Sequence, residues 1–297
     1  MKILQSTQVQ EIDAYTIENE PILSINLMER AAGQCSQWIC KHFGPSYKIN
    51  IFIGPGNNGG DGLAMARQLA ENDYEVYVFL VKISSKLSPD AQRNLKRLEV
   101  NHRVPVTTIA SVKDFPVLPK GQIVIDGLFG SGLSRPLEGF PAKVVEFLNS
   151  LDAIRIAIDM PSGLFGEDNS ENTGTIFRAR YTLTFQFPSL SFFYPENENF
   201  VGQWHVLPIG LSSQKIQQME TPYQLLTKDF IKHHLITRKR FSHKGNYGHT
   251  LLICGGYGKM GAAVLAAQAA LRTGAGLVTV HLPKVGYQIM QTSSPEI

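Results

Sequence analysis

Buried strands and amphipathic helices alternate along the first two thirds of the chain. Short apolar runs predict strands at residues 49–53, 76–81, 105–109, 122–126, 154–159, 181–187 and 203–208. Apolar positions at helical spacing predict helices at about 24–43, 61–72, 88–99 and 141–150. Because this alternation is typical of a parallel sheet covered on both faces, we expect residues 1–215 to form a doubly wound, mainly parallel, Rossmann-like α/β domain, a three-layer sandwich.

A further helix is expected near the N-terminus. The segment Thr7-Gln8-Val9-Gln10 fits a capping box with Thr7 as the N-cap. Val9, Ile12 and Ile17 form a partial apolar stripe behind it, which would turn one side of this helix toward the domain.

A second α/β pattern begins near residue 243. It predicts a strand at 250–254, a glycine-rich loop at 255–261, a helix at 262–273 and a strand at 277–281. About 55 residues cannot bury the core of a parallel-sheet domain. We therefore expect residues 243–297 to be the incomplete beginning of a larger α/β domain, preceded by a polar linker at 216–242.

Composition and charge narrow the class of protein. Of the 297 residues, 43% are hydrophobic and 18% are charged, and the net charge is only +3. A nucleic-acid binder would need a stronger basic bias, so no nucleic acid is expected as a partner. Three cysteines without a CxxC pair favour reduced thiols, and no long apolar run predicts a membrane span or a signal peptide. We expect a cytoplasmic protein without a membrane partner; a homodimer is one option that the sequence leaves open.

Ligands of parallel sheets bind beyond the carboxyl ends of the strands, which selects the loops after strands 49–53, 122–126 and 154–159. The first loop, 54–62, contains a formal GxGxxG pattern whose glycines would let the backbone approach a pyrophosphate at a helix N-terminus. A dehydrogenase also needs an acidic residue at the end of the second strand, and Val81-Lys82-Ile83 provides none. We expect Asp61 to cap the following helix and to order the loop.

Asp126 and Asp159 end the strands before the other two loops. A carboxylate at such a buried position needs a cation or several hydrogen-bond donors. Because the two strands are expected to be neighbours, the two groups suggest an acid/base pair, or one carboxylate on a metal and the other on substrate; capping of nearby turns is the structural alternative. Arg135, in the loop after Asp126, could pair with a phosphate or could be a surface arginine.

These loops resemble those of a known family. The segments GPGNNGGDGLAMARQLA, DGLFGSGLSRP and DMPSG, followed by TLTFQFP, closely resemble the NAD(P)H-hydrate epimerase family, the YjeF N-terminal domain, over about residues 1–213. The tail from His243 resembles the start of the NAD(P)H-hydrate dehydratase domain, which implies that residues 243–297 are a truncated ribokinase-like α/β segment. The resemblance implies a bifunctional repair enzyme for nicotinamide nucleotides. Its isomerase would interconvert the R and S epimers at C6 of hydrated NADH or NADPH (NADHX or NADPHX), and its lyase, in a full-length protein, would dehydrate the S epimer at the expense of ADP or ATP.

The resemblance also implies the site residues. Asp159 would bind the substrate and act as the catalytic acid or base. Oxygen atoms of Asn58, Asp126 and Ser162 would hold a potassium ion, a ligand set that suits a hard cation. The other implied substrate-binding positions are Asn57, Asn58, Gly59, Gly60, Asp61, Gly130, Ser131, Gly132, Leu133, Ser134, Arg135 and Pro136, with Ala262 in the tail.

Two departures from the family pattern affect these expectations. Pro188-Ser189 stands where family members often have Pro-Lys. If that lysine helps to hold phosphate, another group would have to do so here, and Arg135 is one candidate. The catalytic aspartate and nucleotide loop of the dehydratase family would follow Ile297, so residues 243–297 alone are expected to lack that activity, and Ala262 would belong to an incomplete site.

Two other functions remain open at this point. An NAD(P)-dependent oxidoreductase would need the acidic residue that the second strand lacks. A dinucleotide- or partner-binding module of the same fold would need no catalytic groups, and the joint presence of Asn58, Asp126 and Asp159 argues against it.

Overall fold

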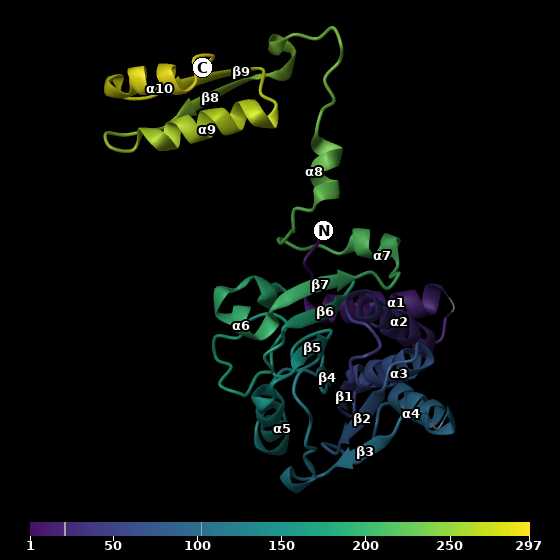
Figure 1. Ribbon diagram of the computed structural model, residues 1–297. Coiled ribbons are helices and arrows are strands. Elements are labelled where there is room, and N and C mark those ends of the chain that lie inside the picture. Colours follow the sequence, from purple (N-terminus) through teal and green to yellow (C-terminus); the bar gives the residue numbers. More distant parts are fainter. Residues whose placement is uncertain (21, 102) are drawn as a thin grey trace. The chain divides into compact units, whose positions relative to one another are not determined.

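A seven-stranded parallel sheet forms the centre of the first unit of the computed structural model, which describes residues 1–20, 22–101 and 103–297 (Figure 1). Its strand order is β3-β2-β1-β4-β5-β6-β7, and every neighbouring pair is parallel. The strands are β1 (Ile49–Ile53), β2 (Val76–Val81), β3 (Val106–Ile109), β4 (Ile123–Gly127), β5 (Ile154–Ile158), β6 (Tyr181–Phe185) and β7 (Gln203–Leu207). The predicted doubly wound α/β fold is confirmed.

Helices cover both faces of the sheet (Figure 1). They are α1 (Ser6–Asn19), α2 (Ser24–His42), α3 (Asn57–Glu71), α4 (Pro89–Asn101), α5 (Gly139–Ser150), α6 (Glu198–Val201) and α7 (Ser213–Gln218). Successive residues of β1 point to opposite faces. Ile51 therefore belongs to the core shared with α2 and α3, whereas Phe52 belongs to the core shared with α5. Burial of both faces explains why the central strands are predominantly apolar.

The chain divides into two compact units, Met1–Thr227 and Lys228–Ile297. The first unit extends beyond the predicted boundary at 215 because the segment up to Thr227 is bonded to the N-terminus. Lys2 pairs with Gln224 in a β-bridge, and its ammonium group donates to the carbonyls of Ile216, Gln217 and Met219. None of the helices in the described part of the chain is long and apolar enough to cross a membrane.

The second unit is a small α/β element. Parallel strands β8 (His249–Ile253) and β9 (Leu277–His281) are connected by α9 (Met260–Thr273), and α8 (Lys228–His234) and α10 (Tyr287–Ser293) lie before and after them in the chain. Its buried cluster is small and includes Ala263, Ala267 and Val278, while Leu251 and Ile253 of β8 are exposed. Such a two-stranded element buries little apolar surface.

Two predicted helix starts are wrong. The first helix begins at Ser6 with Gln5 as its N-cap, because the side chain of Gln8, rather than that of Gln10, accepts from the capping residue's N–H. The third helix begins at Asn57, inside the segment predicted to be a loop. Its glycines are tolerated there because the helix lies close to its neighbours: a Cβ at Gly60 would meet Met28, and one at Gly62 would meet Ile53.

Gly54 permits a close approach between the loops that follow β1 and β4. A Cβ built on Gly54 would lie 2.0 Å from the carbonyl oxygen of Leu128. The Gly54 N–H also donates to the Gly127 carbonyl at 3.0 Å, so the two backbones are in direct contact. This glycine therefore serves packing between loops, whereas Gly56 has open space at its Cβ position.

Replacement of Gly54 by alanine is expected to lower the free energy of unfolding by about 1–3 kcal/mol, because the backbone of Leu128 must move. Gly56→Ala is the matched control and should change stability by a few tenths of a kcal/mol. Urea denaturation followed by tryptophan fluorescence measures both, since Trp38 and Trp204 are the only two tryptophans and lie in the first unit. Equal losses in the two variants would contradict the packing role of Gly54.

Candidate active site at the carboxyl edge of the sheet

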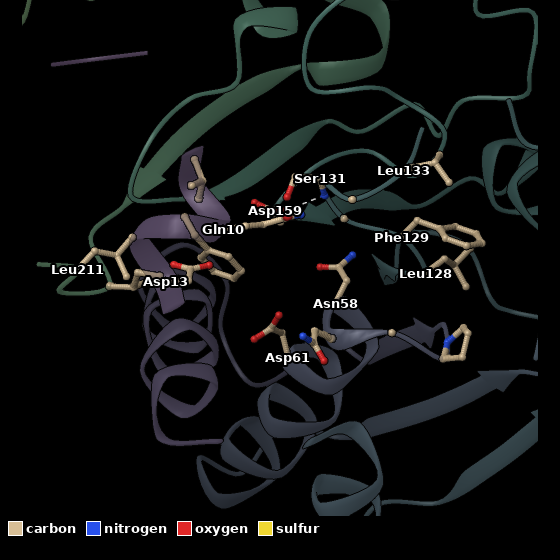
Figure 2. A pocket seen from close by; sticks show the side chains of 18 residues that line it. Gln10, Asp13, Asn58, Asp61, Leu128, Phe129, Ser131, Leu133, Asp159 and Leu211 are labelled. Carbon is tan, nitrogen blue, oxygen red and sulfur yellow. Dashed lines mark hydrogen bonds between the residues drawn. The ribbon is translucent and has the colours of Figure 1, made fainter. Parts of the chain in front are cut away.

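A cavity of about 490 Å³ lies where the loops after β1, β4 and β5 meet (Figure 2). Its lining comes from four regions: the N-terminal half of α1, the start of α3, residues 128–133, and Asp159. Phe185, Ile209 and Leu211 add apolar surface. The three loops predicted to form a site do so because β4 lies between β1 and β5, which places their carboxyl ends side by side.

Asp159 is held in one orientation by its backbone and by a hydrogen bond. Its φ angle is 63°, in the left-handed region that non-glycine residues rarely adopt and that aspartate tolerates better than most. The Ser131 N–H donates to the Asp159 carboxylate at 3.0 Å (Figure 2). Burial raises the pKa of Asp159, while amide groups of Ser131 and Phe185 oppose that rise by stabilising the ionised form.

Asp126 is fully buried and joins the loop after β4 to the loop after β5. The carboxylate accepts from the Ser162 N–H at 2.8 Å, the Ser162 hydroxyl at 2.6 Å and the Leu128 N–H at 3.1 Å. Burial raises the pKa of Asp126 to about 6, and the hydrogen bonds from Ser162 and Leu128 limit that rise. The Ser162 hydroxyl oxygen in turn accepts a hydrogen bond from the Phe129 N–H at 2.9 Å, which fixes the next part of the loop.

Asn58 offers an unsatisfied amide to the cavity. Both its Oδ1 and its Nδ2 atoms are buried, and neither has a hydrogen-bond partner in the part of the chain that the structure describes. A buried polar atom without a partner costs about 1–3 kcal/mol, so such atoms commonly await a ligand or an ion. A Cβ at Gly130 would lie 3.0 Å from Asp159 Oδ2 and 3.4 Å from Asn58 Cγ, which places both groups around the same stretch of backbone.

Asp61 does not cap α3, so that expectation is wrong. The helix begins four residues earlier, Gly56 is its N-cap, and no side chain caps it. Asp61 instead points into the cavity from the second turn (Figure 2). Burial raises its pKa well above the usual range, and Asp159, Asp13 and Asp90 add to this rise by repulsion.

The cavity is rich in carboxyl groups. Asp13, Asp61 and Asp159 line it, and none of its lining residues in the described part of the chain is Lys, Arg or His. The arrangement can exchange protons with a bound molecule, and the oxygens of Asn58, Asp126 and Ser162 suit a hard cation. Within the described ranges, no group of three or more His, Cys, Asp or Glu side chains is placed to hold a metal. A cation here would therefore depend on amide and hydroxyl oxygens beside a single carboxylate.

Some of the predicted substrate positions line the cavity and the others do not. Those that line the cavity are Asn57, Asn58, Asp61, Gly130, Ser131, Gly132, Leu133 and Asp159. Ser134 and Pro136 line another hollow with Phe165 and Asn172, and Arg135 is exposed and lines neither. Gly59 and Gly60 are buried inside α3, where a Cβ at Gly59 would lie 2.0 Å from the Gly54 carbonyl oxygen. Ala262 is an exposed residue of α9 in the second unit.

Sequence reasoning missed the contribution of α1. Val9, Gln10 and Asp13 line the cavity from this helix. A signal was present, because Asp13 stands four residues after Val9 and four before Ile17, on the apolar stripe of the helix. A charged residue on a stripe that turns toward the core identifies a candidate site residue.

Fold and cavity together define a class: a doubly wound α/β domain with a ligand cavity of carboxyl, amide and hydroxyl groups at the carboxyl edge of its sheet. Residues 24–191 match the family described as YjeF-related protein N-terminus. The chain belongs to this family.

Curated relatives extend the match. An NAD(P)H-hydrate epimerase of Rhodopirellula baltica is 36% identical over 71% of this chain and 85% of its own length. One of Oenococcus oeni is 34% identical over 70% of this chain and 96% of its own length. A bifunctional NAD(P)H-hydrate repair enzyme of Moorella thermoacetica is 32% identical over 100% of this chain but only 57% of its own length, so the chain spans little more than half of such relatives.

A solved structure supports the fold. The crystal structure of a yeast protein superposes with a TM-score of 0.60 at 20% identity, covering 77% of this chain and 98% of the yeast chain. At this identity, the likeness concerns the fold alone.

The environment of Asp13 predicts a pH dependence of stability. Burial and the charge of Asp159 raise the pKa of Asp13 from 3.8 to about 7, so the folded unit holds this proton more tightly than the unfolded chain. The free energy of unfolding should therefore fall as the pH rises from about 4 to about 7. At about 1.4 kcal/mol per pKa unit, Asp13→Asn should be more stable than the wild type by about 2–4 kcal/mol at pH 8 and similar at pH 4.

Urea unfolding of the first unit at both pH values measures the difference. Glu18→Gln is the matched control, because Glu18 is an exposed carboxylate of the same helix, and it should show no pH-dependent difference from the wild type. A constant offset between Asp13→Asn and the wild type at every pH would refute the raised pKa.

Proposed function

We propose that the first unit is an NAD(P)H-hydrate epimerase, an isomerase that interconverts the two epimers at C6 of hydrated NADH or NADPH. The observation that carries this proposal is Asp159, a half-buried carboxyl group with a fixed orientation that faces the cavity beside the amide of Asn58. The names of the relatives from Rhodopirellula baltica and Oenococcus oeni support the same reaction.

Epimerisation requires a bond at C6 to break and to form again from the other face. The C6 hydroxyl stands next to the ring nitrogen, whose lone pair can stabilise an iminium when the hydroxyl leaves as water. Asp159 would exchange the proton that this departure and the return of water require. The cavity offers the dinucleotide both an apolar side, at Phe185 and Leu211, and the N-terminus of α3, whose free N–H groups suit a phosphate.

Potassium is the proposed metal cofactor of this site. Among the described residues, Asn58 Oδ1 is buried without a hydrogen-bond partner. Asp126 and Ser162 are joined through short hydrogen bonds on the neighbouring loops, so these three residues would hold the ion. Their amide, carboxylate and hydroxyl oxygens match the preference of a hard cation. The bound ion would supply positive charge to a cavity whose lining, among the described residues, provides no basic side chain.

For the second unit, the proposal concerns only a full-length protein. There, the dehydratase domain would remove water from the S epimer at the expense of ADP or ATP, after the first unit has supplied that epimer. Ala262 stays a predicted substrate contact of that domain.

The first test is epimer interconversion. A single C6 epimer of NADH-hydrate should equilibrate much faster with the protein than without it in potassium buffer, as followed by chromatography. Asp159→Asn should lower the rate by about 10²–10⁴-fold, because it removes a proton-transfer group and keeps the shape of the side chain. If wild type and variant both match the uncatalysed rate, the epimerase proposal fails and a binding role becomes the leading account.

The cofactor proposal has a test that does not depend on activity. An ion that binds only the folded unit raises its stability, so the Tm should rise with KCl relative to tetramethylammonium chloride at equal ionic strength. Asn58→Ala should lose this potassium-specific rise, whereas Asn57→Ala, at the exposed neighbouring position, should keep it. An identical response of all three proteins to the two salts would exclude potassium at Asn58.

A further inference from the structure

We propose that Asp13 is the second catalytic acid–base group of the site and acts together with Asp159 on the two faces of the reacting carbon. This inference rests on the proposed epimerase function and names a residue of α1 that the sequence motifs of the three loops do not contain. Figure 2 shows the two carboxyl groups reaching the same cavity from different elements, Asp13 from α1 and Asp159 from the end of β5.

The position of Asp13 is poorly explained by structure alone. The residue lies on the stripe of α1 that turns toward the cavity, next to Ile12, which is fully buried. Its Oδ1 atom is excluded from solvent and has no hydrogen-bond partner in the described part of the chain. A carboxyl group in such a place costs stability and caps nothing, which is the pattern expected of a functional group.

The pairing of Asp13 with Asp159 has the electrostatics of a proton-sharing pair. Asp159 accepts the Ser131 N–H, a bond that favours its ionised form. Asp13 lacks such a donor at Oδ1, and the negative charge of Asp159 further disfavours its ionisation. The proposal therefore assigns the acid to Asp13 and the base to Asp159.

Asp61 is the rival for this role, and its burial argues against it. It is 9% exposed and sits within α3, where Asp159, Asp13 and Asp90 all repel its ionised form. Because so many neighbouring groups disfavour its ionised form, Asp61 is poorly suited to exchange a proton during turnover. Asp13 belongs to a helix at the rim and is less enclosed, so it can change its protonation state during turnover.

The proposed step balances. The Asp13 carboxylic acid donates its proton to the C6 hydroxyl, the C–O bond breaks with its electron pair on oxygen, and water leaves while the ring nitrogen forms a C=N bond. A water molecule then adds to C6 from the other face, the C=N electrons return to nitrogen, and the Asp159 carboxylate accepts the released proton. One proton has moved from Asp13 to Asp159, and exchange with solvent restores the pair. The reverse reaction uses the same groups in exchanged roles.

The pH dependence of the proposed reaction is assigned to Asp13 and Asp159 after the other charged groups around α1 are considered. Asp159 and Asp61 face Asp13 within the cavity, and Cys35 of α2 is fully buried. Three other charges near α1 are engaged elsewhere, since Lys215 of α7 pairs with Glu11, Arg30 of α2 pairs with Glu20, and Glu167 accepts from Ser6. Glu18 of α1 is exposed. The alkaline limb of the rate profile is therefore assigned to the loss of the one proton that Asp13 and Asp159 share.

The test compares kcat/KM for epimer interconversion across pH 5 to 9 in four proteins: wild type, Asp13→Asn, Asp61→Asn and Glu18→Gln. The wild type should lose activity as the pH rises through about 7, where the shared proton is lost. Asp13→Asn should be slower by about 10²–10⁴-fold with little change in KM, and its profile should lack this alkaline limb. Glu18→Gln should match the wild type in rate and profile.

Each other outcome has a distinct meaning. Uncatalysed rates in the wild type would remove the epimerase proposal itself. An active wild type with an equally active Asp13→Asn variant would overturn the role of Asp13 alone. A slow Asp13→Asn variant that keeps the alkaline limb, or loss of that limb in Asp61→Asn instead, would reduce Asp13 to a structural residue. Unfolding midpoints measured at pH 8 show whether the variants are folded.

Discussion

The burial of Asp126 is the constraint on which the site depends. Removing a carboxylate from water costs several kcal/mol unless donors surround it, and Asp126 is 0% exposed. Its donors come from Leu128 on its own loop and from Ser162 on the next loop, so the two loops must keep one mutual geometry. Asp159 lies three residues before Ser162 and adopts its left-handed backbone within this geometry. The catalytic candidate is thus oriented by a neighbouring carboxylate that does not line the cavity.

The loop after β1 is fixed in a different way, by glycines that let one backbone segment pack directly against another. Gly54 places the β1 loop against the carbonyl of Leu128, and Gly59 places α3 against the carbonyl of Gly54. Backbone packed on backbone leaves little freedom to Asn58, which lies between these glycines in the chain. Its side-chain amide can therefore remain buried with no hydrogen-bond partner among the described residues. A rigid loop of this kind is already ordered before a ligand binds, so binding loses less conformational entropy.

The sequence was informative where one local pattern determines the structure. Apolar runs such as 49–53 and 154–159 predict the strands of the sheet. The rule that ligands bind beyond the carboxyl ends of parallel strands predicts the position of the cavity. Prediction from the sequence is wrong where tertiary packing overrides a local conformational preference. Asn57 to Gly62 resembles a loop because glycine weakens isolated helices, but the segment is helical in the folded unit, where Gly60 and Gly62 pack closely against Met28 and Ile53.

The role of α1 was hidden for another reason. A single sequence shows that Asp13 interrupts an apolar stripe, but it cannot show which distant loop that stripe covers. Arg135 illustrates the converse, since its type suited a phosphate while its position proved to be exposed and outside the cavity. Residue chemistry identifies candidates, and topology decides which of them meet.

The proposed chemistry must also be compatible with the charge of the cavity. A lining with three carboxyl groups and, among the described residues, no basic side chain is a poor environment for an anion but a good one for a developing cation. The hydrated nicotinamide ring is neutral, and it becomes a cationic iminium when the C6 hydroxyl leaves. Negative charge near that ring therefore stabilises the transition state more than the substrate, which is the condition for catalysis. In the proposed function, the phosphates would lie toward the N-terminus of α3, where the helix dipole has the opposite sign. One cavity with two electrostatic ends can accordingly hold an anionic dinucleotide while favouring a cationic intermediate.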